Sequence, residues 1–78
     1  MQAVAVDEIS PLAWRLLRVA AGYDQRGVER EVEEVMQAHI SLLESGNRAL
    51  TTDRLNRLFE LYTEDLSREQ VRALVEHF

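Results

Sequence analysis

The side chains that most often carry out chemistry are few and scattered in this sequence. The histidines are His39 and His77, and there is no cysteine. His39 has Leu43 at the i+4 position, where a zinc-binding helix would carry a second ligand. Four glutamates crowd together between residues 29 and 34, but such a run is usually a solvated helix face rather than a metal site. We therefore expect no enzyme activity, no catalytic residue, no metal and no cofactor.

The charge balance is acidic and contains no lysine. The 78-residue chain has a formal net charge of −5, and all nine of its basic residues are arginine. Two explanations remain open: adaptation to concentrated salt, where carboxylates hold water and ions, or a GC-rich genome that favours arginine codons. Charge alone makes nucleic acid look like a poor partner.

Neither a targeting signal nor a membrane span is evident. The opening letters MQAVAVDEIS lack the basic region and the apolar run of a signal peptide. No stretch approaches the length that crosses a bilayer. We expect one cytoplasmic domain over residues 1–78, with no membrane partner and no small-molecule ligand.

Apolar spacing and capping residues predict an all-α fold of five helices. The third helix is expected at Met36–Ser45 and the last over residues 67–78, where an apolar stripe reaches Phe78. That stripe either folds back on the core or contacts a second subunit in a homodimer. Residues 1–9 are expected to form a flexible arm. Caps or stops are expected at Ser10 (with Pro11), Gly22, Asp24, Gly46, Thr51 or Thr52, and Ser67 (with Gln70). The expected core includes Trp14, Leu16, Leu43, Leu58 and Phe59.

Two segments carry a resemblance to a known family. Leu17 and Arg18, the letters AGYDQ at 21–25 and Val28 form the first, and ISLLESG at 40–46 forms the more specific second. Over residues 12–62 the chain resembles the Cro/C1-type (XRE-type) helix-turn-helix regulators. The resemblance implies a lambda-repressor-like domain with its helix-turn-helix at residues 24–46.

The resemblance also implies roles for individual residues. Gln25 matches a glutamine that touches a DNA phosphate and braces the recognition helix, and Gln37 matches a reader of base edges. Arg18 and Glu44 match a structural salt bridge between the first and third helices. The remaining expected DNA contacts are Arg26, Ala38, His39, Ser41, Leu42, Asn47 and Arg48.

The sequence departs from the family pattern at the turn. Between Gln25 and Glu44 there is one residue more than usual, and we place the extra residue in REVEEVM. The family prefers a small residue at the position of Glu29 and a glycine near Glu33. We expect a longer turn or a shifted register, with Gly27 supplying the close approach of the helices.

The resemblance implies a homodimeric DNA-binding transcriptional regulator, a repressor, associated with the nucleoid. A dimer would read a palindromic operator in double-stranded DNA with two recognition helices about 34 Å apart. The alternative is a helical protein-interaction module, an antirepressor or adaptor, that does not bind DNA. A positive stripe through Gln25, Arg26, Gln37, Arg48 and Arg54 would favour DNA, and a continuous negative face would favour a protein partner.

Overall fold

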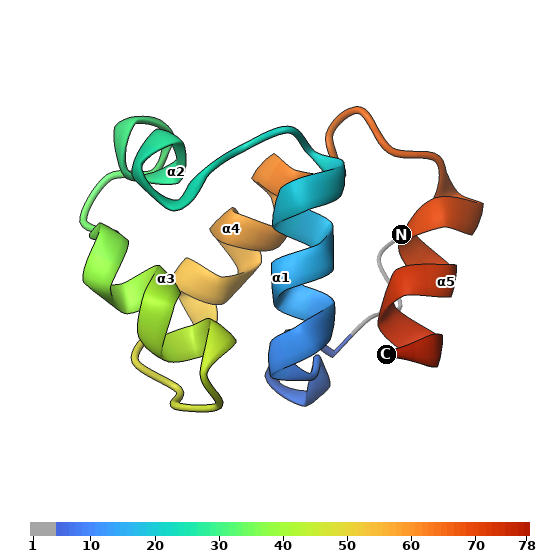
Figure 1. Ribbon diagram of the computed structural model, residues 1–78, viewed down its shortest axis with the longest axis horizontal. Helices are drawn as coiled ribbons and strands as arrows, with labels where there is room; N and C mark the ends of the chain where they lie inside the picture. Colours follow the sequence, from blue (N-terminus) through green and yellow to red (C-terminus); the bar gives the residue numbers. More distant parts are fainter. Residues whose placement is uncertain (1–4) are drawn as a thin grey trace.

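The computed structural model describes residues 5–78, and this part of the chain is helical with no strand (Figure 1). The predicted all-α class with five helices is confirmed. A short 3-10 turn that the sequence did not predict precedes them. The elements are η1 (Val6–Glu8), α1 (Pro11–Ala20), α2 (Gln25–Glu31), α3 (Gln37–Glu44), α4 (Thr52–Thr63) and α5 (Arg68–His77).

The helix ends lie where the capping residues predict them. Each N-cap oxygen accepts a hydrogen bond from a backbone N–H that the first helical turn leaves unpaired. Gly22 and Gly46 follow α1 and α3 with φ angles of +85° and +97°, a backbone region that glycine adopts without steric cost. Ser67 and Gln70 form the reciprocal capping box at the start of α5. The side chains that cap α1, α2, α4 and α5 are Ser10, Asp24, Thr51 and Ser67.

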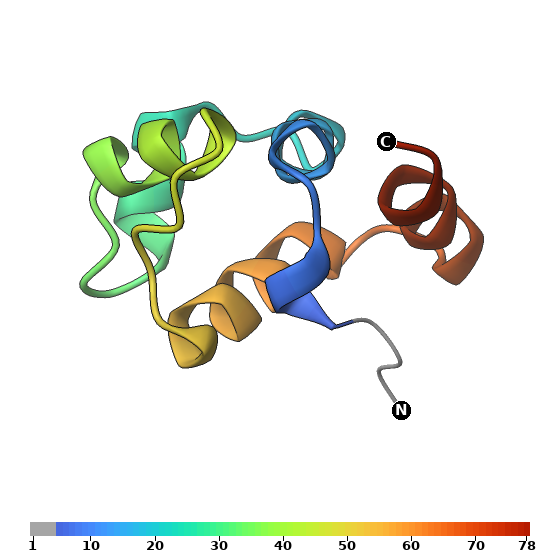
Figure 2. The same ribbon diagram turned by 90° about the horizontal axis from the view of Figure 1, so that it is seen from below.

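Helix α1 is the centre of the arrangement. In Figure 1 it stands between the α2–α3 pair on one side and α5 on the other, and α4 crosses behind it. The view from below shows α1 end-on, with α4 and η1 lying along the opposite side of the molecule (Figure 2). Helix α1 contacts α3, α4 and α5. Because α1 contacts both α3 and α4, it helps to hold α3 in its orientation relative to the rest of the fold.

One hydrophobic cluster fills the space between these helices. Trp14 lies in its middle and meets the Phe59 ring edge-on, with ring centroids 6.3 Å apart. Leu43 and Leu58 are buried as expected, but Leu16 is only half-buried. Leu16 is thus the one member of the predicted core that is not buried.

The predicted flexible arm is wrong for residues 5–9. Val6 and Ile9 are 5% and 7% exposed, and η1 packs against α4. Two apolar residues three positions apart anchor this segment, a pattern too short to stand out in the sequence. Residues 1–4 of the expected arm lie outside the described part of the chain.

Helix α5 folds back on α1. Val71 is buried, Leu74 and Val75 are half-buried, and Phe78 remains 54% exposed. The apolar stripe of the last helix therefore packs within the chain, and only its end is open to solvent. Within residues 5–78 there is no helix with the length and apolarity needed to span a membrane.

Candidate nucleic-acid interface

Helices α2 and α3 contact each other and are joined by residues 32–36. Val32 and Val35 are buried in this turn, which attaches it to the core. Glu34 has a φ of +66°, the left-handed conformation that the family pattern assigns to glycine. The turn thus spans five residues, and a glutamate holds its left-handed position.

Gly27 does not bring α2 close to α3, contrary to our expectation. A Cβ at Gly27 would lie 2.9 Å from the Asp24 Oδ1 atom and 3.5 Å from the Tyr23 ring. The Gly27 amide donates to that same Asp24 oxygen at 2.6 Å. Gly27 therefore makes room for the cap of its own helix.

The N-terminus of α3 is held by two side chains. The Glu29 carboxylate accepts a 2.7 Å hydrogen bond from the backbone N–H of Gln37, and His39 Nδ1 accepts one of 3.0 Å from the backbone N–H of Met36. A carboxylate at a helix N-terminus also interacts favourably with the positive end of the helix dipole. Glu29, which departs from the family pattern, thus holds the start of α3. The Nδ1 atom of His39 is occupied by the cap, which leaves Nε2 for other contacts.

A hydrogen-bonded chain joins the first residues of α2 and α3 to α1. The Gln37 side-chain N–H donates to the Gln25 carbonyl oxygen at 2.9 Å, and the Gln25 N–H donates to Glu44 at 3.3 Å. Arg18 donates two hydrogen bonds to Glu44, at 2.7 and 3.1 Å, and a third to the Tyr23 carbonyl oxygen at 2.8 Å. The predicted Arg18–Glu44 salt bridge is present in bidentate form.

The Arg18–Glu44 pair is mostly shielded from water. The two side chains are 12% and 7% exposed. Hydrogen bonding to Glu44 raises the pKa of Arg18, and partial desolvation opposes this shift. Glu44, which belongs to α3, is thereby neutralised and adds little negative field to the outer face of that helix.

The outer face of α3 carries no charge. Ala38, Ser41 and Leu42 are exposed there, and Gln37 and His39 are half-buried at its beginning. The small side chains of Ala38 and Ser41 allow the helix backbone to approach another molecule closely. The face is therefore compatible with the major groove of DNA, which admits one α-helix.

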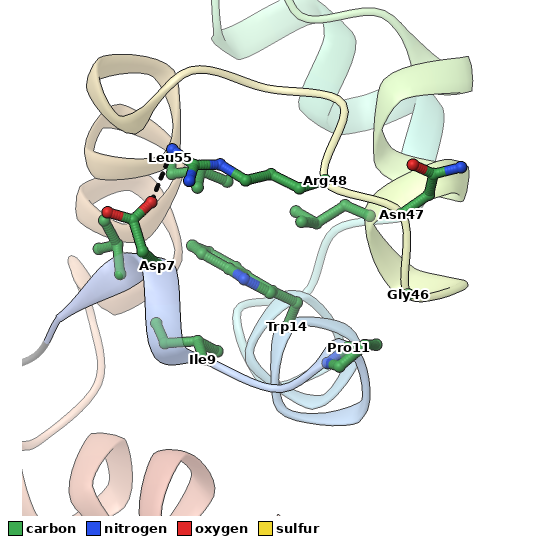
Figure 3. Close-up of a pocket in the computed structure, with 10 residues that line it drawn as sticks. Asp7, Ile9, Pro11, Trp14, Gly46, Asn47, Arg48 and Leu55 are labelled. Carbon is green, nitrogen blue, oxygen red and sulfur yellow. Dashed lines mark ion pairs between the residues drawn. The ribbon is translucent and has the colours of Figure 1, made fainter.

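The arginines expected at the flanks of α3 differ in their surroundings. Arg26 is exposed on α2, and Asn47 is exposed after α3. The Arg48 side chain instead bends back and forms a 2.7 Å ion pair with Asp7 of η1 (Figure 3). Arg54 forms a 2.6 Å ion pair with Glu34 of the turn. The positive stripe that would favour DNA is therefore partly neutralised by carboxylates of the chain itself.

Two functional candidates were missed in the sequence. Asp7 and Glu29 each contact a predicted site residue, but Asp7 is 41 positions away from Arg48 and Glu29 was placed in a solvated acidic run. Only tertiary contacts reveal the first. The second departs from the family's preference for a small residue, but its partner at the start of α3 is eight positions away and follows only from the packing of α2 on α3.

No curated protein and no solved structure matches the chain. A family model does match, over residues 3–55, which contain η1, α1, the α2–α3 pair and the start of α4. The matched segment thus contains the Arg18–Glu44 and Gln25–Gln37 contacts and ends before α5. The chain belongs to the family described as a domain of unknown function, DUF8599.

Proposed function

We propose that the protein is a sequence-specific DNA-binding transcriptional regulator, of the Cro/C1 type that its sequence resembles. Helix α3 would enter the major groove, and α2 would lie across the DNA backbone. The observation that carries this proposal is the 2.9 Å hydrogen bond from Gln37 to Gln25 at the edge of the uncharged α3 face.

The hydrogen-bond capacity of Gln37 suits an adenine edge. Its amide has two N–H donors and a carbonyl acceptor, and one donor is used on Gln25. The remaining donor and the carbonyl oxygen are the pair that reads adenine N7 and N6. Gln25 likewise keeps one N–H after donating to Glu44, and that donor is free for a phosphate oxygen.

A homodimer follows from the same proposal. Two recognition helices about 34 Å apart would read a palindromic operator, and occupation of such a site near a promoter would repress transcription. The exposed Phe78 at the end of α5 is the first candidate for the subunit contact. The protein would act in the cytoplasm, on nucleoid DNA.

Salt dependence separates two forms of this proposal. When Arg48 exchanges Asp7 for a phosphate, one cation leaves the DNA and another can gather at the freed carboxylate, so this contact releases almost no net ions. The lysine-free acidic surface points the same way and supports a halophilic protein. We expect binding that persists in molar potassium chloride, where the Debye length is about 3 Å. A steep loss between low and high salt would contradict the halophilic form only.

One observation favours a second function, a protein-interaction module. Met36 and Leu42 are 55% and 43% exposed at the start and on the face of α3, and the neighbouring Arg48 and Arg54 are both paired with carboxylates. An apolar, uncharged face of this kind also suits a helix of another protein.

Selection from a random-sequence DNA pool, at low and at molar potassium chloride, tests the proposed function. We expect one palindromic sequence to be enriched by the wild type and lost with Gln37→Ala. Asn56→Ala, which removes an exposed amide from α4, is the matched control and should enrich the same sequence. Circular dichroism verifies that both variants are folded. Absence of any enriched sequence in either salt would reject DNA reading and favour the protein-interaction module.

A further inference from the structure

The Arg48 guanidinium is held by three acceptors of the chain itself. It contacts Asp7 Oδ1 at 2.7 Å, the Thr52 hydroxyl at 2.6 Å and the Leu50 carbonyl oxygen at 3.2 Å. Thr52 in turn donates to the Asp7 carboxylate, at 3.1 and 3.2 Å to its two oxygens. Three separate parts of the chain, η1, the α3–α4 loop and the start of α4, thus meet at this arginine.

Asp7 is fixed in position by its neighbours in sequence. Val6 and Ile9 are buried against the core, so the turn between them presents Asp7 toward the α3–α4 loop. Figure 3 shows the ion pair spanning the space above Trp14, between η1 and the loop. The backbone that carries the Asp7 carboxylate is therefore held by the core.

Resting on the DNA-binding function proposed above, we propose that Asp7 is an internal substitute for a DNA phosphate. It holds Arg48 in the free protein and must release it when the loop meets the DNA backbone. Both side chains are about half exposed, at 51% and 43%, and exposed pairs of this kind are weak enough for a phosphate to displace. Asp7 therefore lowers DNA affinity and cancels the salt dependence of this one phosphate contact.

Two measurable consequences follow from this competition. Without the Asp7 charge, Arg48 would pair with phosphate at no internal cost, so affinity at low salt should rise about two- to fivefold. The phosphate contact would then release a cation without a carboxylate to take one up, so the slope of log K against log salt should steepen by about 0.9.

Trp14 provides a spectroscopic signal for the same event. It is the only tryptophan and lines the small pocket beneath the ion pair, together with Asp7 and Arg48. Because Arg48 lies over this pocket, its departure should alter the surroundings of the indole. We expect DNA binding by the wild type to shift the Trp14 emission, and Arg48→Gln to reduce that shift.

The test compares Asp7→Asn with Asp65→Asn, which removes the same charge from the α4–α5 connection, at the far end of α4 from the loop (Figure 1). Affinity for the wild-type enriched duplex, or for the random pool if no sequence is enriched, is measured by fluorescence anisotropy at five potassium chloride concentrations. Asp7→Asn should show both the higher affinity and the steeper slope, and Asp65→Asn should match the wild type. In the Arg48→Gln background, Asp7→Asn should have no further effect.

The outcomes separate this inference from the function on which it rests. Wild-type binding with Asp7→Asn equal to Asp65→Asn would overturn the role of Asp7 and leave DNA binding intact. An effect of Asp7→Asn that persists in Arg48→Gln would also overturn it. If no variant binds DNA, both proposals fall. Binding by Asp7→Asn where the wild type fails to bind would support both.

Discussion

The side-chain amide of Gln37 donates a 2.9 Å hydrogen bond to the side-chain carbonyl of Gln25, so the first residues of α3 and α2 are tied together. Gln25 also donates to Glu44, which places it between the two ends of α3. The orientation of the proposed base reader thus depends on a residue of the preceding helix.

Gln25→Ala should therefore weaken DNA binding more than it weakens the fold. It removes the brace on Gln37 and a phosphate donor, so we expect a loss of about five- to tenfold in affinity. The free energy of unfolding should fall by no more than about 1 kcal/mol, because the site is partly solvated. Fluorescence anisotropy and urea unfolding measure the two effects. A loss of stability without a loss of affinity would assign Gln25 a purely structural role.

The Arg18–Glu44 pair should show strong coupling between its partners. Glu44→Leu leaves a shielded guanidinium without its carboxylate, and we expect a cost of about 3 kcal/mol in the free energy of unfolding. The double variant Arg18→Met with Glu44→Leu removes both charges and should cost less than the two single changes together. Arg57→Ala, which breaks an exposed 3.6 Å pair with Asp53, should cost less than about 1 kcal/mol. Additive single costs in urea unfolding would contradict this coupling.

The turn between α2 and α3 offers a matched pair of neighbouring glutamates. Glu34 holds a left-handed backbone at φ +66°, and Glu33 does not. A glycine relieves backbone strain only at position 34. This relief offsets two costs: the greater flexibility of glycine in the unfolded chain and the loss of the exposed ion pair with Arg54. Glu34→Gly should therefore be more stable than Glu33→Gly by about 1 kcal/mol. Thermal unfolding measures the stabilities of the two variants. Equal stabilities would mean that the backbone at Glu34 is not strained.

The Tyr62 hydroxyl is buried and forms no hydrogen bond within the described residues. Tyr62→Phe should leave the free energy of unfolding at pH 7 unchanged or raise it by about 1 kcal/mol, since an unpaired buried polar group is costly. Burial raises the pKa of Tyr62, and the nearby Glu44 carboxylate adds to the shift while Arg18 opposes it.

A raised tyrosine pKa also predicts how stability depends on pH. The fold keeps the Tyr62 phenol neutral where the unfolded chain ionises, near pH 10. The contribution of the neutral Tyr62 phenol to the free energy of unfolding is thus fully present below about pH 10 and is lost as pH rises above that value. In urea unfolding between about pH 8 and about pH 11, the free energy of unfolding of Tyr62→Phe should fall less steeply with pH than that of the wild type. An identical decline in both proteins would mean that the phenol ionises equally in the fold.

The helices and the partly buried ion pair could be predicted because their signals are local or belong to a family pattern. Ser10, Asp24 and Ser67 are N-caps, and Gly22 and Gly46 end helices, because capping depends on residues within one turn. The Arg18–Glu44 pair came from the resemblance, since 26 positions separate its members.

The contacts that alter the candidate site could not be predicted. Whether Arg48 faces a phosphate or Asp7 depends on where η1 packs, and that packing rests on Val6 and Ile9, a pair too short to show a period. The role of Glu29 at the start of α3 depends on the angle between two helices, which no local pattern specifies.

Whether α3 reads bases is tested most directly by changing what Gln37 can read. Arginine bonds guanine O6 and N7, where glutamine bonds adenine N6 and N7. Selection from a random DNA pool with Gln37→Arg should therefore replace adenine by guanine at one position of each half-site and leave the other positions unchanged. An enriched sequence identical to that of the wild type would show that Gln37 does not face the bases and would contradict DNA reading by α3.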